Sequence, residues 1–195
     1  QKTLQVIRKA DPEFKVSLAG NFHKELEADI YDYCIPIGAS YPAEVLARRA
    51  QNNLPTTYYT CCTEAFPNTF TFSDPAEAAW MSYYSAKDHL DGYLRWAYNS
   101  WPKEPLLDSR FEAWAGGDTY LVYPGARSSI RFEKLIEGVQ AHEKITILRK
   151  EFTDKKNKTG FKKLEKMLST FNLRDFPEVP AAETVNKANK ILNSL

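Results

Sequence analysis

Residues 92–101, GYLRWAYNSW, combine flat aromatic rings and polar groups in one short stretch. Sugars present polar edges and apolar C–H faces, so saccharide sites combine an aromatic platform with a few hydrogen-bonding groups. The candidate platforms are Trp96, Tyr98 and Trp101. The candidate polar partners are Arg95 and Asn99. Arg95 and Asn99 fall on the same face of a strand with a period of two, where an apolar core would have to satisfy or expel them. The alternative, tryptophans that only fill the core, stays open for each ring.

Glycoside hydrolysis needs two carboxylates, or a carboxylate pair that assists a substrate amide, around the scissile bond. The candidates in predicted loops are Glu64, Asp108 and Asp118, and each is isolated in the sequence. Asp118 follows two glycines and is equally suited to capping a turn. None of the three is therefore assigned a catalytic role from the sequence.

Composition excludes several partners. The 195 residues carry 26 basic and 25 acidic side chains, so no overall field attracts nucleic acid or an anionic membrane surface. No apolar run reaches the roughly 18 residues of a membrane span. We predict neither a nucleic-acid nor a membrane partner.

The cysteines and histidines do not form a metal-ligand pattern, and we expect no metal and no cofactor. Cys34, Cys61 and Cys62 lie in strand-like runs and are predicted to be small buried apolar residues. Their odd number argues against a disulfide framework.

Predicted strands and helices alternate along the first half of the chain. Runs rich in β-branched and aromatic residues predict strands at 14–20, 30–38, 56–62 and 91–101. Helical signals lie between them at 21–28 with Asn21 as N-cap, at 41–51 with Pro42 at the entry, and at 73–90 with Ser73 or Asp74 as cap. This alternation predicts an α/β fold of parallel strands, either a doubly wound sheet or a (β/α) barrel. Because no Gly-x-Gly-x-x-Gly or Walker-type loop is present, the nucleotide-binding sheet is the weaker choice.

The pattern changes after the fourth predicted strand. Residues 114–129 predict a loop with a hairpin, and a long helix follows from Ser129. Its apolar stripe is predicted to pack on the sheet and consists of Ile130, Leu135, Val139 and Ile145. A lysine-rich, solvated turn and two smaller helices, around 160–172 and 182–195, complete the chain.

Ligands of parallel α/β folds bind beyond the carboxyl ends of the strands. The chemically rich residues after the predicted strands are Asn21, then Tyr59, Cys61 and Glu64, then Trp96 to Trp101. We expect the functional site among them.

Several long strings resemble the C-terminal part of the catalytic domain of glycoside hydrolase family 123. They are YYTCC (58–62), PNTFTFSDPAEAAW (67–80), DGYLRWAYNSW (91–101), EPLLDSRF (104–111) and GGDTYLVYPGARSSIRFEKLIEGVQAHEKI (116–145). The resemblance covers most of residues 1–150. It implies a TIM barrel that hydrolyses terminal β-linked N-acetylgalactosamine, with the 2-acetamido group of the substrate as nucleophile.

In that family an adjacent Asp-Glu pair, at the end of the fourth barrel strand, orients the amide and donates the proton. The dipeptide Asp-Glu occurs nowhere in this sequence, and on the resemblance it would lie just before Gln1. The four strands would then be barrel strands five to eight, and we expect the chain to be a piece of a longer polypeptide. Thr57 and Tyr58 replace a tryptophan pair of many relatives, and His142–Glu143 replaces an Asp-Tyr pair.

These observations predict the C-terminal half of a (β/α)8 barrel in residues 1–150 and a helical extension in 151–195. The residues expected to bind the sugar, a terminal N-acetylhexosamine of a glycan, are Tyr59, Arg95, Trp96, Asn99 and Trp101. Alone, the chain is expected to be inactive, and to pair with the missing N-terminal half of the barrel or with itself. Family analogy implies a secreted or periplasmic protein. The alternatives are a non-catalytic carbohydrate-binding module and a structural module.

Overall fold

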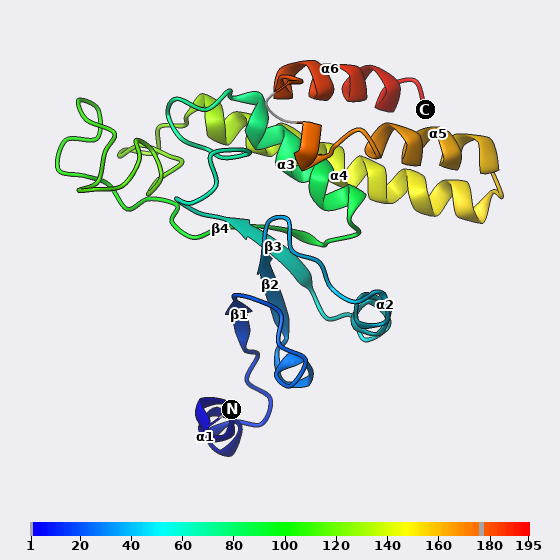
Figure 1. Cartoon of the computed structure of the whole chain (residues 1–195), viewed down its shortest axis with the longest axis horizontal. Helices are drawn as coiled ribbons and strands as arrows, with labels where there is room; N and C mark the ends of the chain where they lie inside the picture. Colours follow the sequence, from blue (N-terminus) through cyan, green and yellow to red (C-terminus); the bar gives the residue numbers. More distant parts are fainter. Residues whose placement is uncertain (1, 176–177) are drawn as a thin grey trace. The chain divides into compact units, whose positions relative to one another are not determined.

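The computed structural model describes residues 2–175 and 178–195 (Figure 1). They divide into two compact units. The first comprises the described residues up to Tyr59 together with Leu90–Leu94, and the second comprises Thr60–His89 and Arg95–Leu195.

A parallel sheet organises the first unit. Its strands are β1 (Ser17–Ala19), β2 (Asp32–Pro36), β3 (Thr56–Thr60) and β4 (Gly92–Arg95), and they lie side by side in the order of the sequence. Leu18 pairs with Tyr33, and Cys34 pairs with Thr57. The predicted α/β fold with four parallel strands is confirmed. Strands that follow one another without insertion are the arrangement found along a (β/α) barrel wall.

Two helices and a short 3-10 turn accompany this sheet: α1 (Lys2–Ala10), α2 (Ala43–Gln51) and η1 (Glu27–Asp29). Helix α2 begins directly after Pro42, as predicted. Its Arg49 is fully buried and donates to the carbonyl oxygens of Ile30, Tyr31 and Pro55 at 3.0, 2.7 and 2.7 Å. A guanidinium has five N–H donors, so one buried arginine can satisfy several loop carbonyls.

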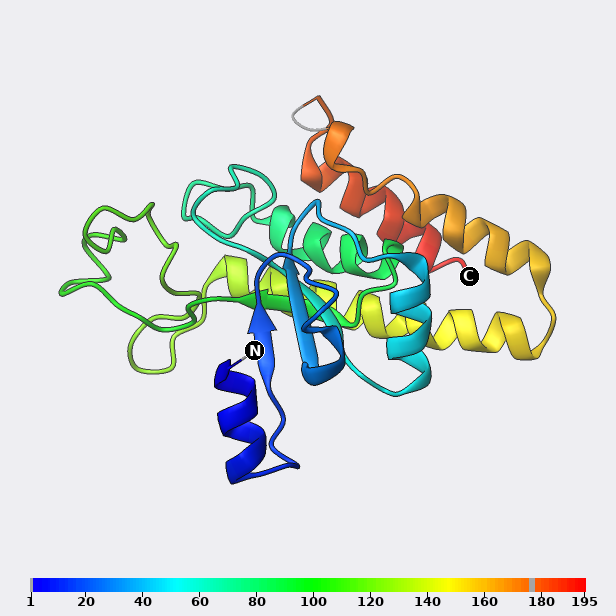
Figure 2. The ribbon, with the colours of Figure 1, turned by 60° about the horizontal axis from the view of Figure 1, so that its bottom comes forward.

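In the part of the second unit that the structure describes, the α-helices are α3 (Ala76–Lys87), α4 (Ile130–Asp154), α5 (Lys158–Leu168) and α6 (Ala181–Leu192), and a short 3-10 turn, η2 (Leu173–Asp175), lies between α5 and α6. Every residue from Ala76 to Ala86 is buried, because α3 packs against the other three helices. Both ribbon views show α3 and α4 lying along each other (Figures 1 and 2). A Cβ on Gly138 of α4 would lie 2.9 Å from the Cα of Ala79, so the absence of a side chain permits this close approach.

The helix predicted at 21–28 is wrong, because that segment contains only η1. The Tyr33 hydroxyl donates to the Asn21 carbonyl at 3.0 Å and accepts the His23 N–H at 2.9 Å. These bonds hold the segment in a non-helical path. Helix α1 was not predicted.

The fourth strand is shorter than predicted and ends at Arg95. Residues 96–101 therefore do not continue the strand, and the expectation that Arg95 and Asn99 share one strand face is wrong. Asn99 instead makes an isolated antiparallel bridge with Tyr120. A second bridge joins Tyr123 to Arg127, within the predicted hairpin.

The long helix begins where predicted, and the Ser129 hydroxyl accepts the Phe132 N–H at 3.2 Å. The predicted stripe is wrong at Ile130 and Val139, which are 63% and 52% exposed, whereas Ile145 is buried. The buried residues of α4 are Arg131, Gly138, Ala141, Ile145, Leu148 and Phe152. The proposed domain boundary at residue 150 stays a prediction.

Burial of the cysteines was predicted correctly for Cys34 and wrongly for the other two, since Cys61 is half-buried and Cys62 is exposed. All three are free thiols. Among residues 2–175 and 178–195, no group of three or more His, Cys, Asp or Glu side chains could hold a metal ion. No helix in the same ranges is long and apolar enough to cross a membrane.

Candidate functional site

The last residues of two strands lead into the candidate site. Strand β3 ends at Thr60 and leads into a turn at Cys62–Thr63, and β4 ends at Arg95 and is followed by Trp96. Tyr59 is half-buried in β3 of the first unit, and its carbonyl accepts the Ile37 N–H at 3.0 Å. The other four predicted site residues belong to the second unit.

A buried ion pair between Arg95 and Asp118 forms the centre of the site. Their side chains are 4% and 0% exposed. Arg95 donates through Nη2 to both the Oδ1 and the carbonyl oxygen of Asp118, and through Nη1 to Asn68 Oδ1 at 2.9 Å. The Trp96 indole N–H also donates to Asp118 Oδ1, at 3.3 Å. Asp118 therefore fixes both the guanidinium and the indole ring, a role that the turn-capping interpretation did not anticipate.

One oxygen of the Asp118 carboxylate accepts no hydrogen bond from the residues that the structure describes. Asp118 Oδ2 is buried and has no hydrogen-bond partner among the described residues, and the same holds for Arg95 Nε. A buried polar atom without a partner loses its solvation without compensation. Asp118 Oδ2 is therefore an unsatisfied acceptor among the described residues.

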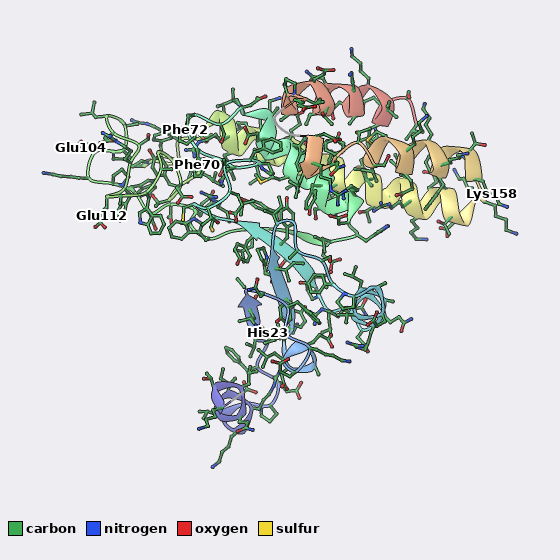
Figure 3. All side chains as sticks on the ribbon, viewed as in Figure 1. His23, Phe70, Phe72, Glu104, Glu112 and Lys158 are labelled. Carbon is green, nitrogen blue, oxygen red and sulfur yellow. The ribbon has the colours of Figure 1, made fainter. Side chains whose placement is uncertain are left out.

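Two indole rings lie near this ion pair. Trp96 is 43% exposed and Trp114 is 40% exposed, with ring centroids 5.5 Å apart and planes inclined by 51°. Trp114 was missed by the sequence analysis, because it lies in an irregular loop with no periodicity to mark it. The loop segment between β4 and α4 extends away from α3 and α4, and Glu104 and Glu112 lie toward its outer part (Figure 3).

Asn68, also missed, connects the turn after β3 to the ion pair. It is 1% exposed and donates through Nδ2 to the carbonyl oxygens of Cys61 and Glu64, both at 2.7 Å. Its Oδ1 accepts from Arg95. One side-chain amide thus joins the segments that follow β3 and β4.

Glu64 stabilises the same turn. Its Oε2 accepts the Cys61 N–H at 2.6 Å, and its Oε1 accepts from the Thr63 hydroxyl at 2.7 Å. Burial would raise the pKa of Glu64, but these hydrogen bonds outweigh it and hold the pKa below the ordinary value. Glu64 is therefore a charged structural acceptor near neutral pH.

Arg131 holds the Gly116–Gly117 turn that precedes Asp118. Its Nη1 donates to the carbonyl oxygens of Thr69 and, at 2.8 Å, of Gly117. Gly117 has a φ of +77°, and a Cβ there would lie 2.5 Å from Arg131 Nη1. Burial lowers the pKa of Arg131 below its usual value.

Asn99 and Trp101 lie together in a pocket of about 370 Å³. Its aromatic lining is completed by Tyr98, Tyr123 and Phe132, and Glu133 adds a carboxylate. The Trp101 indole N–H donates to the Val122 carbonyl at 2.7 Å, which fixes the ring. Within the second unit, the predicted residues thus form two groups: Arg95 with Trp96, and Asn99 with Trp101.

Parallel strands whose carboxyl ends lead into polar and aromatic loops characterise α/β proteins that bind ligands at that edge. The model of the glycoside hydrolase 123 catalytic domain matches residues 1–148, and the chain belongs to this family. The chain matches no curated protein sequence.

A solved family 123 glycoside hydrolase from Clostridium perfringens, described for glycolipid glycan hydrolysis, is similar in structure. The TM-score is 0.71 at 25% sequence identity, and the match covers 92% of this chain and 35% of that protein. The chain therefore spans about a third of the length of this neighbour.

Proposed function

We propose that this chain forms the sugar-contacting part of a glycoside hydrolase acting on a terminal β-linked N-acetylhexosamine of a glycan. Membership of family 123 and the neighbour described for glycolipid glycan hydrolysis support this. The observation that carries the proposal is the buried Asp118 carboxylate, whose Oδ2 is unpartnered and whose Oδ1 holds a half-exposed indole ring. A saccharide offers a hydroxyl for the first and a C–H face for the second.

Each predicted residue has a proposed role. Trp96, with Trp114 beside it, stacks on the sugar ring, and Asp118 accepts a hydrogen bond from the sugar. Arg95 is a positioning residue, since both Nη atoms already bond protein groups and its side chain is 4% exposed. Asn99 and Trp101 contact a further part of the glycan in their pocket, and Tyr59 contributes its half-exposed ring.

The catalytic carboxylates are proposed to come from polypeptide outside this chain. The sequence contains no Asp-Glu dipeptide, and the chain covers 35% of its structural neighbour. In the proposed mechanism that pair orients the 2-acetamido group and protonates the leaving oxygen. The chain itself supplies sugar binding and orientation.

The partner is proposed to be the N-terminal half of a barrel, or a second copy of the chain. β1 and β4 are the outer strands of the sheet among the described residues. Open strand edges favour pairing with another chain. A secreted or periplasmic setting, where glycans are accessible, is proposed with it.

Titration with N-acetylgalactosamine tests the binding role. We expect saturable heat for the chain, no detectable heat for Trp96→Ala, and an affinity at least tenfold lower for Asp118→Asn. Phe161→Ala is the matched control, because Phe161 is 37% exposed but lies on α5, and it should bind as the unmodified chain does. No heat for the chain itself, or unchanged heat for Trp96→Ala, would contradict the proposal.

The rival function is a non-catalytic carbohydrate-binding module, which the missing Asp-Glu dipeptide favours. Adding the preceding part of the polypeptide separates the two. A glycosidase half should then turn over a chromogenic N-acetyl-β-galactosaminide, and a binding module should not.

A further inference from the structure

Two consecutive cysteines, Cys61 and Cys62, lie immediately after β3, and neither has a role in the proposed sugar binding. Neighbouring side chains of a strand point to opposite faces, which would keep two adjacent thiols apart. Here the strand ends at Thr60 and the chain turns at Cys62–Thr63. At this turn the Cys61 Sγ lies 3.3 Å from the Thr63 hydroxyl, and an interaction with the Cys61 thiol contributes to the raised pKa of Cys62.

The pair is accessible to a small molecule. Cys62 is exposed and Cys61 is half-buried, and both are free. The third cysteine, Cys34, is buried in β2 and serves as an internal reference. Burial, the Cys61 thiol and the charge of Asp118 raise the pKa of Cys62, so its thiol stays protonated near neutral pH. Exchange with a disulfide proceeds through the thiolate, so we expect it to be slow near neutral pH and faster as the pH rises.

The peptide unit between the two cysteines is connected to the candidate site. Its carbonyl, that of Cys61, accepts from Asn68 Nδ2 at 2.7 Å. Asn68 accepts in turn from Arg95 at 2.9 Å, and Arg95 pairs with Asp118. The Cys61–Cys62 peptide unit is thus connected to the Asp118 carboxylate through two hydrogen bonds and the Arg95–Asp118 ion pair.

We propose that Cys61 and Cys62 are a redox modification site that forms a vicinal disulfide by exchange with a small-molecule disulfide of the glutathione class. One cysteine thiolate attacks a sulfur of that disulfide and releases one small thiol, which leaves a mixed disulfide on the protein. The neighbouring cysteine then attacks the protein sulfur and releases the second small thiol. The two cysteines lose two electrons and two protons, and the small disulfide gains them as two thiols.

Closing this bond changes the site because the new ring contains the Cys61–Cys62 peptide unit. The ring constrains that peptide, and we expect its carbonyl to turn away from Asn68. The Asn68 amide then loses an acceptor, and its bond to Arg95 is no longer fixed. If the chain binds sugar as proposed, we expect the oxidised chain to bind N-acetylgalactosamine at least tenfold more weakly. Reduction should restore the affinity.

Mass spectrometry tests the covalent step without reference to sugar. The folded chain is incubated with oxidised glutathione, alkylated with iodoacetamide and digested. We expect the peptide with both cysteines to lose two hydrogens and to take no alkyl group, whereas the reduced chain takes two. The variant Cys61→Ser should stop at a stable glutathione adduct on Cys62, because it lacks the second thiol. Glutathione adducts on both cysteines, a disulfide between two chains, or no reaction would overturn the proposal.

A second measurement tests the coupling. Hydrogen exchange in peptides spanning residues 61–68 should accelerate on oxidation and return to its starting rate with dithiothreitol, whether or not sugar binds. The sugar titration is then repeated on the oxidised chain. A vicinal disulfide with unchanged exchange would overturn the coupling. A chain that binds no sugar in either state, but shows the disulfide and the faster exchange, would instead contradict the proposed function and leave the modification site supported.

Discussion

Removal of one partner from the Arg95–Asp118 ion pair should destabilise the chain strongly. In Arg95→Met the hydrogen bonds to Asn68 and Asp118 are lost. Among the described residues, the Asp118 carboxylate, which is 0% exposed, then keeps only the 3.3 Å contact from the Trp96 indole as a side-chain donor. An uncompensated buried charge costs about 3 to 5 kcal/mol. Urea unfolding followed by circular dichroism and by tryptophan fluorescence measures this as a lower midpoint with an unchanged slope.

An exposed pair provides the control. Arg110 and Asp108 form an ion pair at 3.0 Å with side chains 71% and 50% exposed, so Arg110→Met should leave the unfolding midpoint unchanged. The double variant Arg95→Met with Asp118→Asn should be less destabilised than the sum of the two single variants, by roughly 1 to 3 kcal/mol. A cost below about 1 kcal/mol for Arg95→Met, or strict additivity, would refute the assignment of a coupled buried pair.

Three further comparisons test separate parts of the structure by the same unfolding assay. The pKa of Glu64 in the folded chain lies below its ordinary value of 4.5, so the charged carboxylate stabilises the fold near neutral pH and Glu64→Gln should be less stable there. The stability difference between the unmodified chain and Glu64→Gln should disappear as the pH falls below 4.5 and through the lower pKa of the folded state. Gly138→Ala should destabilise by about 1 to 3 kcal/mol despite its better helix propensity, since a Cβ meets backbone at 2.9 Å, whereas exposed Val139→Ala should change stability by less than about 0.5 kcal/mol. Trp80 is 3% exposed, so Trp80→Ala should lower the free energy of unfolding by about 3 to 5 kcal/mol. Trp96 is 43% exposed, so Trp96→Ala should lower it by clearly less. Equal losses for the two variants would mean that Trp96 is a core residue.

The sheet was predictable because its strands are local signals. Each run of β-branched and aromatic residues became a strand, and alternation with helical segments correctly predicted parallel order. The errors arose where a contact distant in sequence overrides local preference. Tyr33 holds residues 21–23 in a non-helical path, and Asn99 bridges to Tyr120 although its neighbours have the composition of a strand.

The candidate site was predictable in composition and not in connectivity. Trp96 was predicted as a platform from its residue type and its place after a strand. Its ring is half-exposed, and its role as a platform stays a prediction. Asp118 was considered as a candidate carboxylate and as a turn residue, but its pairing with Arg95 was not predicted, because the two residues are 23 positions apart. Asn68 gave no signal at all, since an asparagine in a loop is ordinary until its two carbonyl partners are placed.

The geometry of Asp118 favours a binding role over a purely structural one. A buried ion pair is weak evidence for stability, since apolar residues of similar volume often serve as well. Asp118 Oδ2 has no partner among the described residues, as is also true of Arg49 Nε and Arg131 Nη2. It alone among these three atoms belongs to a carboxylate that also holds the half-exposed ring of Trp96. That arrangement costs free energy in the free chain and becomes favourable only when a donor arrives. Asp118→Asn separates the two roles, because a structural acceptor would mainly change the unfolding midpoint, whereas a ligand acceptor would also change the affinity for the sugar at temperatures where the variant remains folded.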